Sequence, residues 1–179
     1  YYTACPNPFL GDFVRIHGKP FDPDETYERE PFAVDTKEGK TDQLYKVHGY
    51  HTKVPHLAIV PSLLHYTRPG DIVLDGFCGS GMTGLATQWC GSAPPSYRRK
   101  LEEEWRREGR PKPNWGARHA IVADLSPAAT HIAAGYNLPF DVRAFQKTAE
   151  SILDEIEREV GWMYETLHTD GKTKGRINY

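Results

Sequence analysis

The stretch from Asp71 to Gly84, DIVLDGFCGSGMTG, constrains the fold more than any other part of the chain. Its apolar run, Ile72 to Leu74, is short and partly β-branched, which is typical of a buried strand in a parallel sheet. An acid, Asp75, follows, and the chain then passes through a glycine-rich loop. Glycines let a backbone approach a ligand closely. The stretch therefore predicts a strand, a ligand-binding loop and a helix over 82–90 that Gly91 caps.

The same order of strand, acid and helix recurs from Arg118 to Asn137. Here an apolar run ends in Asp124, and Ser126 and Pro127 suit the N-cap and the first residue of a helix. Strands that alternate with helices indicate an α/β fold with a parallel sheet.

The ligand of the glycine loop can be narrowed by chemistry. Residues 79–84 satisfy G-x-G-x-x-G, which is weak evidence alone, and a phosphate-binding P-loop is excluded because no lysine follows the glycines. A dinucleotide fold expects a strand-end acid about 20 residues on, where only the charged run 102–104 lies. Asp75 would also repel a pyrophosphate and favour an ammonium group. With Asp124 accepting hydrogen bonds from a ribose, these preferences describe S-adenosylmethionine. A tight turn with close helix packing is the alternative.

Three motifs, in order, resemble the amino-group DNA methyltransferases, which modify adenine N6 or cytosine N4. That family has an Asp-Pro-Phe-Cys-Gly-Ser-Gly-Thr core, which residues 75–83 match apart from Gly76 in place of proline and the inserted Met82. Upstream, residues 50–55 are similar to the family's His-Pro-Thr-Gln-Lys-Pro segment at Thr52 and Pro55. Asp124 matches the ribose-binding acid after the second strand. The resemblance covers residues 50–137.

The resemblance implies a Rossmann-like fold, S-adenosylmethionine as cofactor, and DNA as the partner of the whole protein. It also implies direct methyl transfer to an amino nitrogen, without a covalent intermediate. The residues it assigns to the cofactor are Thr52, Asp75, Gly76, Phe77, Cys78, Gly79, Ser80, Gly81, Thr83, Asp124 and Leu125.

The family's catalytic loop has no match in the chain. That loop is an Asp, Asn or Ser followed by two prolines and an aromatic residue; Asn7 to Phe9 has one proline too few, and a serine separates Tyr97 from the prolines before it. We interpret both strings as loop structure. We therefore expect the catalytic residues beyond Tyr179, an incomplete sheet, and a chain that carries the N-terminal, cofactor-binding part of the enzyme.

The cysteines and histidines indicate neither a disulfide framework nor a metal site. Cys5, Cys78 and Cys90 are odd in number and lack CxxC spacing, which fits a reducing cytoplasm. Cys78 also lacks the Pro-Cys setting of cytosine-C5 methyltransferases, so we interpret it as a packing residue. The three histidines within 48–56 suggest a metal only by number, and we expect none.

The charged segment 92–117 predicts an exposed helix inserted between core elements. Its six basic residues between Arg98 and Arg110 alternate with glutamates, so we expect a solvated face rather than a phosphate-binding surface. The net charge of -2 gives no overall attraction to nucleic acid. The four tryptophans, 89, 105, 115 and 162, are expected to pack.

The remaining segments complete the expected organisation. Residues 1–49 predict an irregular arm with short strands at 12–18 and 31–35, and residues 50–179 the cofactor-binding part. Helices are expected over 54–66 and, capped near Asp141, along an apolar stripe that runs to Leu167. No apolar run approaches the roughly 20 residues of a membrane helix, so no membrane partner is expected. The oligomeric state stays open.

Three functions therefore stay open. The leading one is the cofactor-binding part of a DNA amino-methyltransferase. An RNA or small-molecule methyltransferase with the same cofactor site is the second, and a non-catalytic module that recognises nucleic acid or a protein is the third. A nicotinamide-dependent enzyme is a distant fourth.

Overall fold

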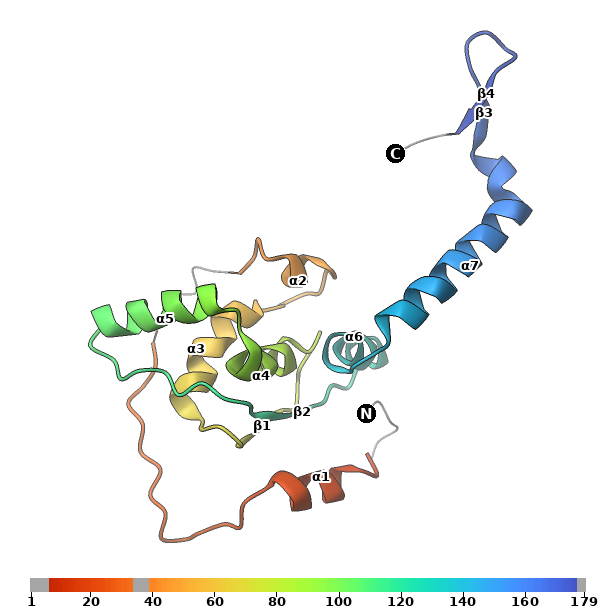
Figure 1. Ribbon diagram of the computed structural model, residues 1–179. Coiled ribbons are helices and arrows are strands. Elements are labelled where there is room, and N and C mark those ends of the chain that lie inside the picture. The colour runs from red at the N-terminus through yellow and green to blue at the C-terminus, as the bar shows by residue number, and fades with distance from the viewer. Residues whose placement is uncertain (1–6, 34–38, 177–179) are drawn as a thin grey trace. The chain divides into compact units, whose positions relative to one another are not determined.

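The computed structural model describes residues 7–33 and 39–176, and Figure 1 shows the order of their elements. The chain forms two compact units, Tyr1–Leu138 and Pro139–Tyr179. In the first unit the elements are α1 (Leu10–His17), α2 (Gln43–Lys46), α3 (His56–Tyr66), β1 (Ile72–Asp75), α4 (Met82–Ser92), α5 (Pro95–Arg107), β2 (His119–Val122) and α6 (Pro127–Asn137).

A small parallel sheet joins the two predicted strands. β1 pairs with β2 in parallel, with Ile72 opposite His119 and Asp75 opposite Val122. The order strand, helices, strand and helix is confirmed, and the arrangement is compatible with the α/β fold that the sequence predicts. Within the described ranges this sheet has two strands.

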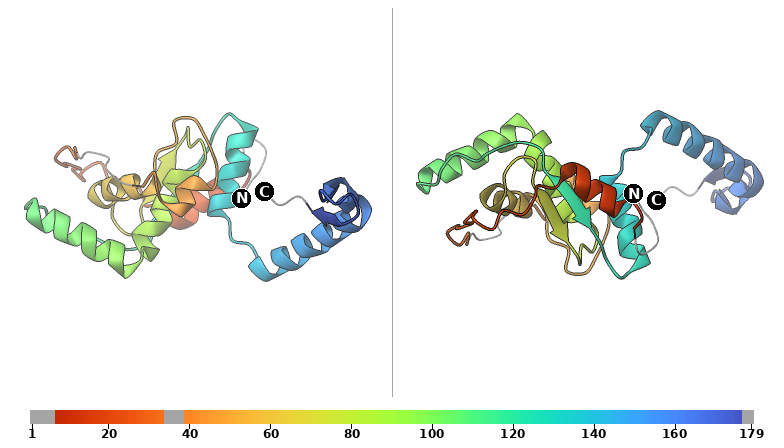
Figure 2. Two further views of the ribbon diagram at one scale, coloured as in Figure 1. Left: turned by 90° about the horizontal axis from the view of Figure 1, so that it is seen from above. Right: turned by 90° about the horizontal axis from the view of Figure 1, so that it is seen from below.

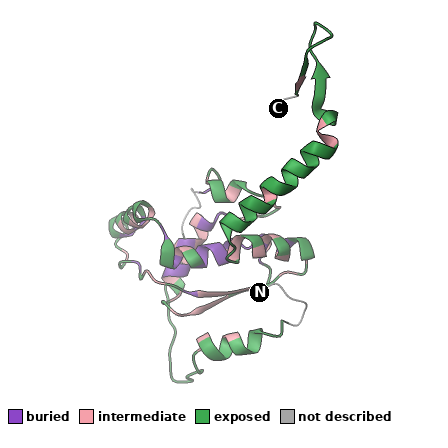
Figure 3. Cartoon of the chain, turned by 45° about the vertical axis from the view of Figure 1, so that its right-hand side comes forward, coloured by how far each residue is buried: buried purple, intermediate pink, exposed green. Residues whose placement is uncertain are grey.

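The core of the first unit lies between helices. Its buried cluster joins α3, α4 and α5 through Val60, Leu63, Leu64, Ala86, Cys90, Leu101 and Trp105. Figure 3 shows that the buried residues gather on the helices rather than on the strands. We predicted an exposed helix within residues 92–117, and this prediction is wrong for one face of α5, which is buried. Leu101 and Trp105 are four residues apart, so both side chains turn to the same side and pack.

The prediction that residues 72–74 form a buried strand holds for one face of β1 only. Val73 packs against the helical core. Leu74, its neighbour, points to the opposite face and is 72% exposed. The side chains of a strand alternate between the two faces of its sheet. β1 is therefore buried only on the face that contacts the helical core.

The helix ends agree with the sequence in part. Ser126 caps α6, since its hydroxyl accepts the Ala129 N–H at 3.4 Å, and Pro127 is the first residue of that helix, as predicted. The assignment of Gly91 as a C-cap is wrong, because α4 continues to Ser92 and Ala93 caps it. Gly91 instead lies where a Cβ would be 3.1 Å from the Ala117 backbone, so its small size allows close packing.

The first expected strand of the N-terminal arm is a helix, α1. Its Phe13 and His17 are one turn apart, and both rings contact His119 of β2, with centroid distances of 6.0 and 3.9 Å. Figure 2, viewed from below, shows α1 beside the two strands. The contact pattern follows the helical spacing of these rings, which the strand interpretation of residues 12–18 overlooked. Of the second expected strand, residues 31–33 are irregular and 34–35 lie outside the described residues.

The second unit is a helix followed by a hairpin. It contains α7 (Val142–Val160), a 3₁₀ turn (Gly161–Tyr164) and the antiparallel strands β3 (Glu165–Leu167) and β4 (Lys174–Arg176). Asp141 caps α7 through the N–H groups of Arg143 and Ala144, as predicted. The expected continuation to Leu167 is wrong, because the backbone leaves the α-helical state at Gly161.

The apolar stripe of α7 is exposed rather than buried. Phe145, Ile152 and Ile156 are 62%, 50% and 47% exposed. The prediction that Trp162 packs is wrong in this structure, where it is 65% exposed. None of the described helices combines the length and the apolar composition needed to cross a membrane.

Candidate cofactor site

The ends of β1 and β2 bring the two predicted acids to one edge of the sheet. The N–H of Ala123 donates to the carbonyl of Asp75 at 2.8 Å, and the N–H of Cys78 donates to the carbonyl of Ala123 at 2.9 Å. One step further, the N–H of Gly79 donates to Oδ2 of Asp124 at 2.9 Å. The glycine loop after the first strand is thus held by the acid after the second.

Asp124 is an ionised hydrogen-bond acceptor. Its Oδ1 accepts the N–H of Ser126 at 2.9 Å. The hydrogen bonds from Ser126 and Gly79 lower the pKa of Asp124 below its ordinary value. A carboxylate offers about four lone-pair positions, so these two bonds leave capacity for further donors.

Asp75 ties the loop to the start of α4. Its Oδ2 accepts the hydroxyl of Thr83 at 2.6 Å, and its Oδ1 accepts the N–H of Phe77 at 3.1 Å. The inserted Met82 shifts Thr83 by one place relative to the family pattern, and Thr83 still reaches the acid.

Gly81 makes the loop fit against α6. It has φ 79°, and a Cβ on it would lie 2.6 Å from Cβ and 2.8 Å from Cα of Ala133. Asn137 adds a hydrogen bond from Nδ2 to the Gly81 carbonyl at 3.1 Å. Close packing against α6 therefore explains why residue 81 is a glycine. Gly79, in contrast, donates its N–H to Asp124.

Two large apolar side chains, which follow the two acids in the sequence, are exposed to solvent. Phe77 is 85% exposed and Leu125 is 92% exposed. Gly76 is exposed as well, and a Cβ on it would meet no atom within 4 Å. Cys78, Ser80 and Gly81, in the same loop, are buried. An apolar surface beside two carboxylates suits a ligand that has both a flat ring and positive charge.

Cys78 is a buried thiol rather than a nucleophile. Burial, with Asp75 and Asp124 nearby, raises the pKa of Cys78 to about 11. The thiolate, which is the reactive form, is therefore disfavoured. Cys90 lies in the core, while Cys5 lies outside the described residues.

The segment before α3 reaches the loop through a residue that the sequence did not single out. The ring of Tyr50 lies where a Cβ on Gly79 would be 2.9 Å from it. Thr52 is exposed, has φ 61°, and donates its hydroxyl to the carbonyl of His51 at 2.6 Å. In the sequence, the feature that could have indicated this contact was the aromatic residue two positions before Thr52.

The other candidates take up packing or ion-pair roles. Tyr97 donates its hydroxyl to the carbonyl of Leu57 at 3.0 Å, and Arg98 donates to the carbonyls of Ala93 and Gly91 at 3.0 and 2.6 Å. Arg107 and Arg110 pair with glutamates at 3.4 and 2.6 Å.

His56 is buried and has no hydrogen-bond partner for either ring nitrogen among the described residues. In that part of the chain no three His, Cys, Asp or Glu side chains gather as a metal site would require.

The comparison with known families agrees with the site. Residues 20–92 match a family model described as DNA methylase. The matched segment contains the Tyr50 turn and the whole glycine loop. It confirms the resemblance to the adenine-N6 and cytosine-N4 DNA methyltransferases and indicates a methyltransferase. Neither a curated protein nor a solved structure matches the chain.

Proposed function

We propose that the chain binds S-adenosylmethionine at the ends of β1 and β2 and serves as the cofactor-binding part of a DNA methyltransferase acting on adenine N6 or cytosine N4. The hydrogen bond from Gly79 to Asp124 carries this proposal, because it joins two motifs 45 residues apart into one site. The DNA methylase match supports the reaction class.

The residues at the strand ends fit the chemistry of this cofactor. Asp124 has acceptor positions left for ribose hydroxyls, and the backbone of the glycine loop lets the amino-acid end approach. Asp75 supplies negative charge for an ammonium group. Phe77 and Leu125 offer exposed apolar area for an adenine ring.

The proposed role of the chain is orientation. The cofactor supplies an electrophilic methyl group on a sulfonium, so the protein needs no nucleophile of its own, in keeping with the protonated thiol of Cys78. The sequence holds no Asp-Pro-Pro-aromatic string to hold the amino group of a base. We therefore expect cofactor binding without methyl transfer from these 179 residues alone.

Calorimetric titration tests the proposal. S-adenosylmethionine and its demethylated product should bind, and NAD should not. Asp124→Asn should weaken binding roughly tenfold to a hundredfold, since a hydrogen bond to a charged group is worth about 1.5–3 kcal/mol. Asp154→Asn, on α7 and outside the site, is the matched control. Binding of NAD alone, or equal affinity in both variants, would refute the assignment.

A further inference from the structure

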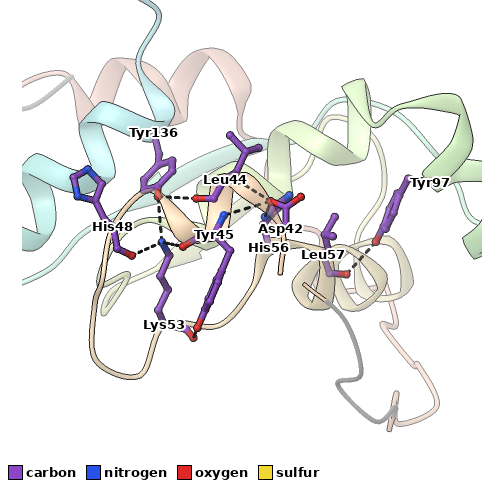
Figure 4. Close-up of polar contacts among 9 residues, drawn as sticks. All are labelled: Asp42, Leu44, Tyr45, His48, Lys53, His56, Leu57, Tyr97 and Tyr136. Atoms are coloured by element: carbon purple, nitrogen blue, oxygen red, sulfur yellow. Dashed lines mark hydrogen bonds and ion pairs between the residues drawn. The ribbon is translucent and has the colours of Figure 1, made fainter. Parts of the chain in front are cut away.

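The ammonium group of Lys53 is enclosed by three oxygen acceptors, as Figure 4 shows. It donates to the carbonyls of Tyr45 and His48 at 2.7 and 3.0 Å, and to the hydroxyl of Tyr136 at 3.1 Å. A lysine has three N–H donors, so these bonds use all of them. Lys53 is therefore committed to the protein rather than available to a ligand.

Aromatic rings reinforce this enclosure. The nitrogen of Lys53 lies 5.0 Å from the ring centroids of both Tyr45 and Tyr136, which is within the range of cation–π attraction. The hydroxyl of Tyr136 also donates to the carbonyl of Leu44 at 2.8 Å. Lys53 and Tyr136 together fasten the segment from Leu44 to Lys53 onto α6.

Residues close to Lys53 and Tyr136 in the sequence contact the glycine loop at two positions. Asn137, next to Tyr136 on α6, donates to the carbonyl of Gly81. Tyr50, three residues before Lys53, places its ring against Gly79. The N–H of Lys53 also donates to the carbonyl of Tyr50 at 3.3 Å, which closes the turn between them.

The turn between Tyr50 and Lys53 is strained. Thr52 is β-branched and has φ 61°, in the left-handed region that such residues avoid. A strained backbone of this kind persists only where surrounding contacts fix it. The side chain of Lys53 supplies such contacts at the adjacent residue.

We propose that Lys53, held by Tyr45, His48 and Tyr136, is a positioning residue that fixes Tyr50 against Gly79 and thereby sets the geometry of the glycine loop. Its effect on a ligand rests on the proposed function. Its effect on the loop does not, because the contact of Tyr50 with Gly79 and the bond from Gly79 to Asp124 lie within the chain.

The test compares Lys53→Met with Lys46→Met in the 179-residue chain. Lys46 is an exposed lysine of α2 in the same segment, so it controls for loss of charge. Tyr136→Phe is a milder second variant that removes one acceptor and keeps the ring. The amide resonance of Gly79 in a ¹⁵N correlation spectrum is the readout, with the Thr87 amide in α4 as the internal standard for an intact core.

We expect Lys53→Met to shift or broaden the Gly79 resonance and to weaken S-adenosylmethionine binding about tenfold, with Tyr136→Phe intermediate and Lys46→Met unchanged. If Lys53→Met does not fold, the Gly79 resonance in Tyr136→Phe decides. A Gly79 resonance at its native position in both variants would overturn the proposal. If the native chain binds no S-adenosylmethionine, the proposed function fails, while the Gly79 resonance still decides the role of Lys53.

Discussion

Replacing Gly81 by alanine should destabilise the first unit strongly, and the structure gives the size of the effect. At φ 79° an L-residue pays about 1–2 kcal/mol for the left-handed conformation. The added methyl would also lie 2.8 Å from Cα of Ala133, a backbone atom that cannot rotate away. Such overpacking costs about 1–3 kcal/mol. We therefore expect the free energy of unfolding to fall by roughly 2–5 kcal/mol.

Urea unfolding followed by circular dichroism measures this loss. Gly76→Ala is the matched control, because Gly76 lies in the same loop and a Cβ there would meet no atom within 4 Å. Exposed substitutions of this kind change stability by about 0.5 kcal/mol or less. A loss below about 0.5 kcal/mol for Gly81→Ala, or equal losses in both variants, would refute the packing of α6 against the loop.

Three further predictions concern buried groups. Trp105→Ala should lower the free energy of unfolding by about 3–5 kcal/mol, as judged by denaturant unfolding, whereas an exposed helix would lose little. Burial lowers the pKa of His56 below 6.5, so the unfolded chain takes up this proton at a higher pH than the folded chain. The contribution of His56 to stability should therefore be complete above pH 6.5 and be lost as the pH falls below it, and His56→Leu should flatten that slope. Because the pKa of Cys78 is raised from 9.0 to about 11, its thiolate fraction at neutral pH is roughly a hundredfold lower than that of a free thiol, and mass spectrometry should show correspondingly slow alkylation. Alkylation of Cys78 at the rate of a free peptide thiol would contradict its burial.

The sequence predicts the parts of the site that local chemistry determines. A strand before an acid, a glycine loop, and a Ser-Pro helix start are each written within a few adjacent residues. β1, β2 and the cap of α6 by Ser126 therefore appear where they were expected. Asp75 and Asp124 lie at the same edge of the sheet because the carboxyl ends of parallel strands lie side by side.

Contacts between distant segments could not be predicted in this way. Phe13 contacts His119, which is 106 positions further along the chain (119 − 13), and Trp105 is buried against α3 and α4. The contact of Tyr50 with Gly79 joins residues 29 positions apart (79 − 50), and the bond from Lys53 to Tyr136 joins residues 83 positions apart. Periodicity carries no information about such partners, because any one apolar stripe can face several neighbours.

The parallel pairing of β1 with β2 also determines when the candidate site can form. Register partners such as Ile72 and His119 are 47 positions apart (119 − 72), and the chain between them includes α4 and α5. Contacts at this separation close late, because the chain must first lose the entropy of a long loop. The helices α3 and α4 form from nearer segments. We therefore expect the bond from Gly79 to Asp124 to be among the last to form during folding. A ligand held there would bind only the completed fold, and its binding would raise the melting temperature by an amount that grows with the logarithm of its free concentration relative to its Kd.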